Sequence, residues 1–153
     1  MKELDRIDRK ILRAMQDNGR LTNLELAEKI SLSPTATAER LKRLTRDGYI
    51  QGYTAKLSAE KLDRGMLVFV EVKLDRTTPD VFDAFSRAVQ KSDEVMECHM
   101  VAGGFDYLVK ARVKGMDAYR SFLSDVILSL PGVRETHTYP VMEEVKNTGK
   151  LPV

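Results

Sequence analysis

Apolar residues recur every three or four positions through the first fifty residues, which is the spacing of amphipathic helices. Leu4, Ile7, Ile11 and Met15 share one side of a helix expected over residues 5–17. Residues 22–25, Thr-Asn-Leu-Glu, form a capping box, in which the threonine and glutamate side chains satisfy free backbone N–H groups. We expect a second helix from there to about residue 30.

A third helix is expected over residues 33–47. Ser33 is a favourable N-cap, Pro34 suits the first helical position, and Gly48 suits the end of the helix. Two short helices joined by a turn of a few residues are typical of a helix-turn-helix, whose second helix enters a DNA groove.

The third helix carries small residues near its start and arginines further along. Small residues allow close approach to a groove, and arginines bind phosphates or a guanine edge. We therefore predict a DNA interface, with contacts from Ser33, Thr35, Thr37, Arg40, Arg43 and Arg46. The alternative is an ordinary surface helix whose charged face is solvated.

The pattern changes after residue 48. Residues 49–57 are rich in β-formers and predict a strand, and residues 58–65 predict a turn or short helix. We expect a helix-turn-helix domain at residues 1–48, a linker strand and turn at 49–65, and a second domain at 66–153.

The second domain alternates between the two periodicities. Strands are expected at residues 66–75, 95–102, 105–114 and 133–145, and helices at 79–91 and 116–130. This βαββαβ order is that of a ferredoxin-like domain. The predicted fold class is α+β, with a winged-helix-like helix-turn-helix followed by this sheet domain.

Apolar residues fall on both faces of the predicted sheet. Helices cover one face, yet Leu67 and Phe69 point to the other face. An uncovered apolar patch is typical of an association surface. We predict a homodimer through the second domain, which presents two DNA-reading helices to two half-sites.

Charge and composition agree with this interpretation. Residues 1–64 hold 14 Lys+Arg and 10 Asp+Glu, whereas the remainder carries a net charge of −2. A basic N-terminal part suits an anionic partner such as double-stranded DNA. A single cysteine, Cys98, suits a reducing compartment, and no apolar run is long enough for a membrane span. We expect a cytoplasmic, nucleoid-associated protein.

The sequence contains no phosphate-binding loop, dinucleotide fingerprint or nucleophile motif. Cys98 and His99 are neighbours on a predicted strand, so they point to opposite faces and cannot share a metal ion. We expect neither an enzyme nor a metal site nor a cofactor. An amino-acid-metabolism enzyme regulated by the ferredoxin-like domain is the enzymatic alternative, and it lacks a catalytic constellation.

Several segments in order, including LDRIDRKIL, LSPTATAERLKRL, GYIQGYTAKL and ECHMVAGGFDYLVK, resemble the Lrp/AsnC (feast/famine) transcription regulators. The resemblance covers nearly the whole chain. It implies a winged helix-turn-helix, an effector domain called RAM, dimers that assemble to octamers, and an amino-acid effector such as leucine. The alternative is an architectural protein that packs DNA without responding to a ligand.

The resemblance also implies an effector site beside the turn between the second and third strands. Glycines there offer backbone N–H groups to a carboxylate, and an aspartate suits an ammonium group. The implied effector-binding residues are Met100, Gly103, Gly104, Asp106, Tyr139, Pro140 and Val141. The alternative is a plain hairpin turn that Asp106 caps.

Overall fold

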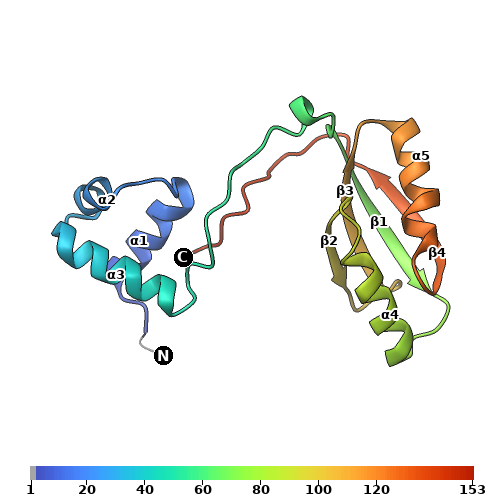
Figure 1. Cartoon of the computed structure of the whole chain (residues 1–153), viewed down its shortest axis with the longest axis horizontal. Coiled ribbons are helices and arrows are strands. Elements are labelled where there is room, and N and C mark those ends of the chain that lie inside the picture. Colours follow the sequence, from blue (N-terminus) through green and yellow to red (C-terminus); the bar gives the residue numbers. More distant parts are fainter. Residues whose placement is uncertain (1–2) are drawn as a thin grey trace. The chain divides into compact units, whose positions relative to one another are not determined.

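The computed structural model describes residues 3–153, which form two compact units. The N-terminal unit comprises the chain up to Lys56 together with Asn147–Val153. The sheet unit comprises Leu57–Lys146 (Figure 1). No helix in the described part of the chain is long and apolar enough to cross a membrane.

Three helices build the N-terminal unit: α1 (Arg6–Asp17), α2 (Asn23–Ile30) and α3 (Pro34–Arg46). The predicted caps are confirmed, since Thr22 accepts a hydrogen bond from the Glu25 N–H and Ser33 accepts one from the Ala36 N–H. The turn between α2 and α3 is tight because Ser31 adopts a left-handed conformation, with φ of 58°. The core consists of Ile11, Leu12, Ala14, Met15, Leu26, Ile30 and Leu44.

The strand predicted at residues 49–57 does not form in the single chain. The N–H groups of Tyr49 and Ile50 both donate to the carbonyl of Leu44, and the residues after them are extended but join no ladder. A strand needs a neighbour to satisfy its backbone groups, and this segment has none within one chain. The prediction was therefore wrong for the isolated chain.

The sheet unit confirms the predicted order of elements. Its strands and helices are β1 (Met66–Leu74), α4 (Pro79–Val89), β2 (Val95–Met100), β3 (Tyr107–Val113), α5 (Met116–Asp125) and β4 (Val133–Pro140). Short 3-10 turns lie at Glu60–Leu62 and Ile127–Ser129. The strands are antiparallel in the order β2-β3-β1-β4, so β2 and β4 are the two edges.

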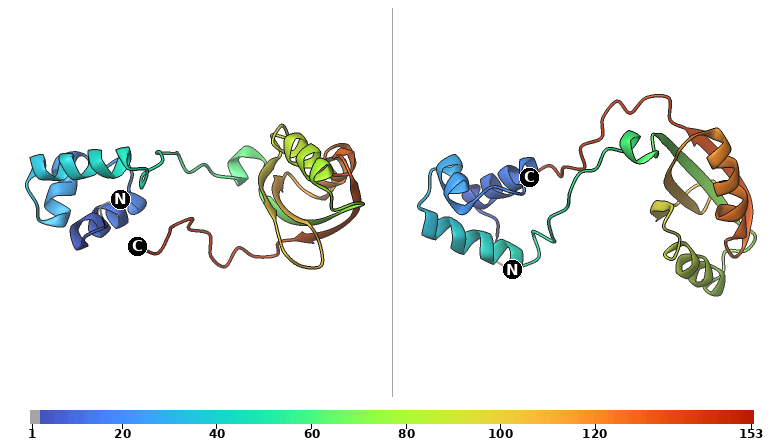
Figure 2. Two further views of the ribbon diagram at one scale, coloured as in Figure 1. Left: turned by 90° about the horizontal axis from the view of Figure 1, so that it is seen from below. Right: turned by 45° about the horizontal axis from the view of Figure 1, so that its top comes forward.

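Both helices pack on one face of this sheet (Figure 2). Their apolar side chains meet the alternate residues of β1 and β3 that point inward, from Val68 to Leu74 and from Tyr107 to Val113. The ring of Tyr107 stacks on that of Phe85, with centroids 4.3 Å apart. The sheet therefore has one fully packed face and one outer face.

The predicted elements of the sheet unit are all somewhat shorter than expected, and the last helix and the last strand differ most. The helix predicted to end at residue 130 ends at Asp125 and continues as a 3-10 turn, and the last strand ends at Pro140 rather than at residue 145. Beyond β4 the chain leaves the sheet and its last seven residues join the N-terminal unit. The predicted assignment of residues 147–153 to the second domain thus differs from the observed packing.

Candidate nucleic-acid interface and ligand site

The outward face of α3 is a stripe of exposed residues at spacing i, i+4, i+7 and i+11. It consists of Thr35, Glu39, Lys42 and Arg46, and Ser33 and Pro34 are exposed at its N-terminal end. Side chains at this spacing lie above one another along a helix. We call these six residues the α3 stripe. It offers hydroxyl groups at one end and two cations at the other.

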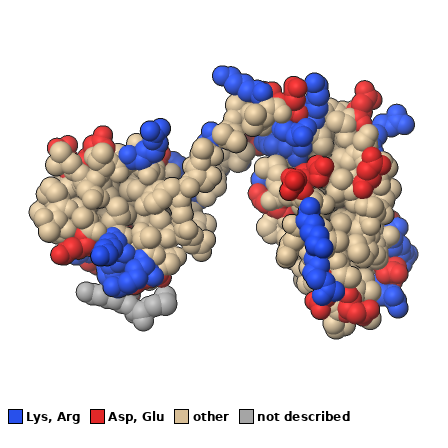
Figure 3. All heavy atoms as spheres, in the orientation of Figure 1, with Lys and Arg blue, Asp and Glu red and all other residues tan. Residues whose placement is uncertain are grey.

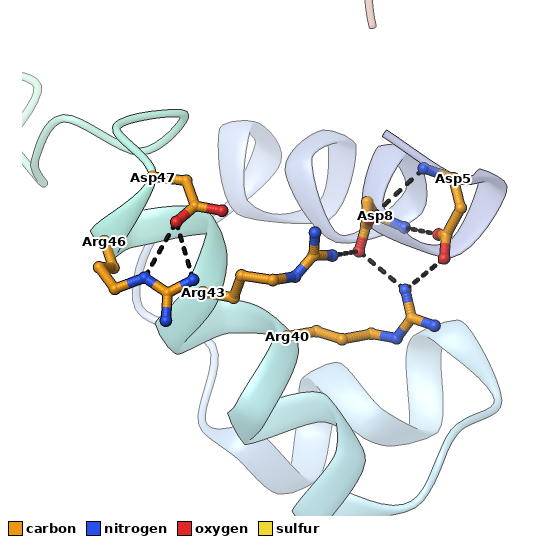
Figure 4. Close-up of polar contacts among 6 residues, drawn as sticks. All are labelled: Asp5, Asp8, Arg40, Arg43, Arg46 and Asp47. Carbon is orange, nitrogen blue, oxygen red and sulfur yellow. Dashed lines mark hydrogen bonds and ion pairs between the residues drawn. The ribbon is translucent and has the colours of Figure 1, made fainter. Parts of the chain in front are cut away.

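Two predicted DNA contacts instead face α1 (Figure 4). Arg43 Nη2 donates to Asp8 Oδ1 at 2.6 Å, and Arg40 Nη1 donates to the same oxygen at 2.8 Å. Arg40 Nη1 also reaches Asp5 Oδ2 at 2.6 Å. Asp8 is only 1% exposed, so its charge depends on these two guanidinium groups. We call Asp5, Asp8, Arg40 and Arg43 the arginine clamp.

The clamp perturbs the acidic groups that form it. Burial alone would raise the pKa of Asp8, but hydrogen bonds from Arg43 and Arg40 outweigh burial and lower it. The Asp8 backbone N–H, followed by the Arg40 guanidinium, lowers the pKa of Asp5 to about 2. Both carboxylates are therefore held in the charged form, and the clamp fixes the orientation of α3 against α1.

Thr37 corrects the predicted interface. Its side chain is fully buried, and its hydroxyl donates to the Ser33 carbonyl at 2.9 Å. The residue follows the inward face of α3 with Leu44, so a direct contact with DNA is excluded in this fold.

The remaining predicted residues stay accessible to different degrees. Ser33, Thr35 and Arg46 are exposed, and the Arg46 guanidinium pairs with neighbouring Asp47 at 2.9 Å. The side chains of Arg40 and Arg43 are 30% and 20% exposed. On the face drawn in Figure 3, basic side chains of the N-terminal unit gather in a patch with acidic groups beside it.

The predicted DNA contacts included Arg43 and left out its neighbour Lys42. In the structure, Lys42 is exposed on the outward face of α3, and Arg43 points toward α1. The signal was present in the sequence: residues 35, 39, 42 and 46 follow helical spacing, and the acidic residues of α1 supply partners for the arginines.

In the sheet unit, the predicted glycine turn connects β2 to β3, and Gly103 and Gly104 are exposed there. Asp106 caps this region. Its Oδ2 accepts from the Leu74 N–H at 2.7 Å, and its own N–H donates to the Val72 carbonyl at 3.0 Å. Asp106 therefore has a structural role, as in the hairpin alternative, and one oxygen is already engaged.

The other predicted ligand residues do not come together in one chain. Met100 lies on β2, whereas Tyr139 and Pro140 lie on β4, and these strands are opposite edges of the sheet. Val141 follows β4 and donates to the Leu67 carbonyl at 2.9 Å. Two whole strands lie between Met100 and Tyr139, so these residues cannot line one pocket within a single chain.

A small hollow does lie beside the glycine turn, on the outer face of the sheet. Its volume is about 180 Å³, and its walls are Glu71, Lys73, Gly104, Phe105, Glu135 and His137. Of the predicted ligand residues, only Gly104 lines it. It holds one cationic side chain and two carboxylates, the groups that complement a zwitterion.

Among the described residues, no group of three or more His, Cys, Asp or Glu side chains is placed to hold a metal ion. The Cys98 thiol points toward the core, and burial raises its pKa to about 11, so it is a poor nucleophile.

Comparison with known proteins adds two family descriptions. Residues 4–51 match "Winged helix-turn-helix DNA-binding", and residues 67–151 match "Lrp/AsnC ligand binding domain". The leucine-responsive regulatory proteins of Escherichia coli K12 and Salmonella typhimurium are each 55% identical over 152 residues, covering 99% of this chain and 93% of theirs.

Solved structures agree over the whole chain. A transcriptional regulator from Neisseria meningitidis, solved as a complex with L-Met, is 39% identical with a TM-score of 0.93, covering 98% of this chain and 97% of that one. An AsnC family regulator from Agrobacterium tumefaciens is 32% identical with a TM-score of 0.92, covering 97% of both. These relatives share the order seen here, with a helix-turn-helix followed by a βαββαβ domain. The chain therefore belongs to the Lrp/AsnC family. It is a DNA-binding transcriptional regulator with a ligand-binding C-terminal domain, and not an enzyme.

Proposed function

We propose that this regulator controls genes of amino-acid metabolism in the cytoplasm and responds to a bound amino acid such as leucine. The observation that carries the DNA part is the α3 stripe, which the clamp on its neighbouring face holds outward. Support for the ligand part comes from relatives named leucine-responsive regulatory protein and from the L-Met complex of the Neisseria relative.

For DNA we propose a division of labour along α3. Ser33 and Thr35 are exposed at the N-terminal end, where a recognition helix approaches base edges, and Arg46 and Lys42 bind phosphates further along. Arg40 and Arg43 act chiefly through the clamp, which fixes the helix, and Arg40 retains enough exposed surface to reach a nearby phosphate.

For the effector we propose a site that begins at the glycine turn and is completed by a second chain. Gly103 and Gly104 offer backbone N–H groups, and Lys73 suits the ligand carboxylate. Met100 from one chain and Tyr139, Pro140 and Val141 from another are the remaining candidates, because their places at opposite sheet edges exclude a shared site within one chain.

The same reasoning supports a homodimer through the outer sheet face, with assembly to octamers as the family resemblance implies. Phe69 and Leu108 lie partly exposed on this face, and Tyr139 is half exposed opposite Phe69. An apolar surface of this kind is stabilised when a second copy covers it.

The test is a titration of the full chain with each of the twenty amino acids, followed by calorimetry, with the binding of a DNA duplex measured in parallel. Saturable binding of leucine or methionine that changes the affinity for DNA supports the proposal. A flat response to all twenty, with DNA bound regardless of sequence, supports the architectural alternative.

A further inference from the structure

The last residues of the chain lie on α1 rather than on the sheet. Residues 147–153, which we call the tail, belong to the N-terminal unit, and the C-terminus lies beside α1 in both views (Figures 1 and 2). The tail contacts residues of α1 that lie more than 130 positions earlier in the sequence. A flexible end without partners would not make such specific contacts.

The tail is held by paired hydrogen bonds on α1. The side-chain amide of Gln16 binds both backbone groups of Leu151, donating to its carbonyl at 3.0 Å and accepting from its N–H at 2.7 Å. Arg13 Nε donates to the Val153 carbonyl at 2.6 Å, and Lys150 Nζ lies 2.7 Å from Asp17 Oδ1. The Val153 side chain packs against the core of the N-terminal unit.

The chain just before the tail is anchored on the sheet unit. The Val141 N–H donates to the Leu67 carbonyl at 2.9 Å, and Glu144 pairs with Arg112 of β3. Only five residues separate Glu144 from Lys150. The segment is therefore a short connection from the end of β4 to α1, in addition to the longer connection through residues 49–65.

One rigid helix receives both the tail and the arginine clamp. The tail binds Arg13, Gln16 and Asp17 in the second half of α1, whereas the clamp uses Asp5 and Asp8 at its start. A helix of 12 residues is about 18 Å long and transmits a displacement along its axis. The tail and the clamp are therefore held by the same helix, and the tail is the direct continuation of the chain that follows β4.

We propose that the tail is a strap by which the ligand-binding domain sets the position of the recognition helix. Ligand bound beside β4 changes how firmly the tail is held on α1, and α1 passes the change to Arg40 and Arg43. This part rests on the proposed effector function. The holding of α1 by the tail in the absence of ligand does not depend on that function.

Two variants of the full chain release the strap from opposite sides. Leu151→Pro removes the backbone N–H that donates a hydrogen bond to Gln16 Oε1. The Leu151 side chain is 74% exposed, so its loss removes little packing. Gln16→Glu keeps the shape of the side chain but replaces the donor to the Leu151 carbonyl by an acceptor. The matched control is Val145→Ala, in the same connecting segment but 88% exposed.

Three measurements are made on each variant: protection of residues 148–153 from limited proteolysis, affinity for a DNA duplex with and without L-leucine or L-methionine, and amino-acid affinity by calorimetry. We expect both variants to lose protection of the tail, and to bind DNA ~3–10-fold more weakly, as one or two lost hydrogen bonds imply. Amino-acid affinity stays within about twofold while its effect on DNA affinity disappears. Val145→Ala behaves as wild type.

The strap is refuted if the variants lose tail protection yet keep both wild-type DNA affinity and the wild-type ligand response. Unchanged tail protection in both variants would refute the assigned contacts. If the wild type binds no amino acid, the effector proposal fails, and DNA affinity without ligand still decides whether the tail holds α1. A circular-dichroism melt verifies that each variant is folded.

Discussion

The charged groups of the arginine clamp are paired with one another within one chain, whereas those around the hollow on the sheet are largely unpaired with one another. In the N-terminal unit, a buried carboxylate on α1 gathers two arginines of α3 into one clamp. On the outer face of the sheet, Glu71, Lys73, Glu135 and His137 surround an open hollow and form few mutual contacts. The first arrangement completes a structure within one chain, and the second leaves groups available for a ligand or another chain.

A related difference separates the two predicted sites: the structure brings the DNA candidates together but not all of the effector candidates. The DNA candidates all lie on or beside one helix, so the structure places them together even where it reassigns their roles. Among the effector candidates, Met100 and Tyr139 lie on the two opposite edge strands, and no element of a single chain brings them together. A helix is complete in itself, whereas an edge strand is defined by what pairs with it or covers it.

The largest expected effect comes from breaking the clamp. Asp8→Ala leaves two cations without their shared partner, one of them largely buried, and we expect the free energy of unfolding of the N-terminal unit to fall by about 2–4 kcal/mol. Urea denaturation followed by circular dichroism measures this. Glu28→Ala is the control, because Glu28 is an exposed carboxylate of α2 that lies outside the clamp. Equal losses in the two variants would contradict the clamp.

The next effect tests the open face of the sheet unit. Tyr139→Glu places a charge at the apolar end of that face, opposite Phe69, and we expect the mass in sedimentation to fall to that of a single chain. Leu57→Glu is the control, since Leu57 is 71% exposed and lies outside the sheet. An unchanged mass for Tyr139→Glu would place the dimer interface elsewhere.

A smaller effect separates the stripe from the clamp on α3. Lys42→Ala should weaken binding to specific and random duplexes alike by ~3–10-fold and reduce the salt slope by about 1, with an unchanged melting temperature. Arg43→Ala should lower the melting temperature, because it removes a partner of buried Asp8. If instead Arg43→Ala leaves stability intact and relaxes sequence preference, Arg43 reads a base.

The smallest effect is on pH dependence. The folded-state pKa values of Asp5 and Asp8 lie below the ordinary value near 3.9, so the clamp stabilises the fold fully above that pH. The contribution is lost as pH falls toward the folded pKa, about 2 for Asp5. Melting temperature measured from pH 6 to pH 2 should fall less steeply in Asp8→Asn than in wild type. Parallel curves would exclude the clamp as the source.

The sequence by itself determined the elements and their order, apart from the strand expected at residues 49–57. Capping residues at Thr22 and Ser33 fixed helix starts, and the change from helical to alternating periodicity after Gly65 fixed the βαββαβ domain. These features are local: each depends on residues within a few positions, so the sequence displays them directly. The exposure of Ser33, Thr35 and Arg46 also agrees with the predicted contacts, which did not include Lys42.

Only the tertiary structure decided which arginines of α3 bind α1 and which unit the last seven residues pack against. Asp8 and Arg43 are 35 residues apart, and the tail meets α1 across 135 residues. Such pairings depend on how whole elements pack, and no periodicity records them. Physical proximity across the fold therefore assigned Arg40 and Arg43 to the clamp, separated Met100 from Tyr139, and joined the end of the chain to its beginning.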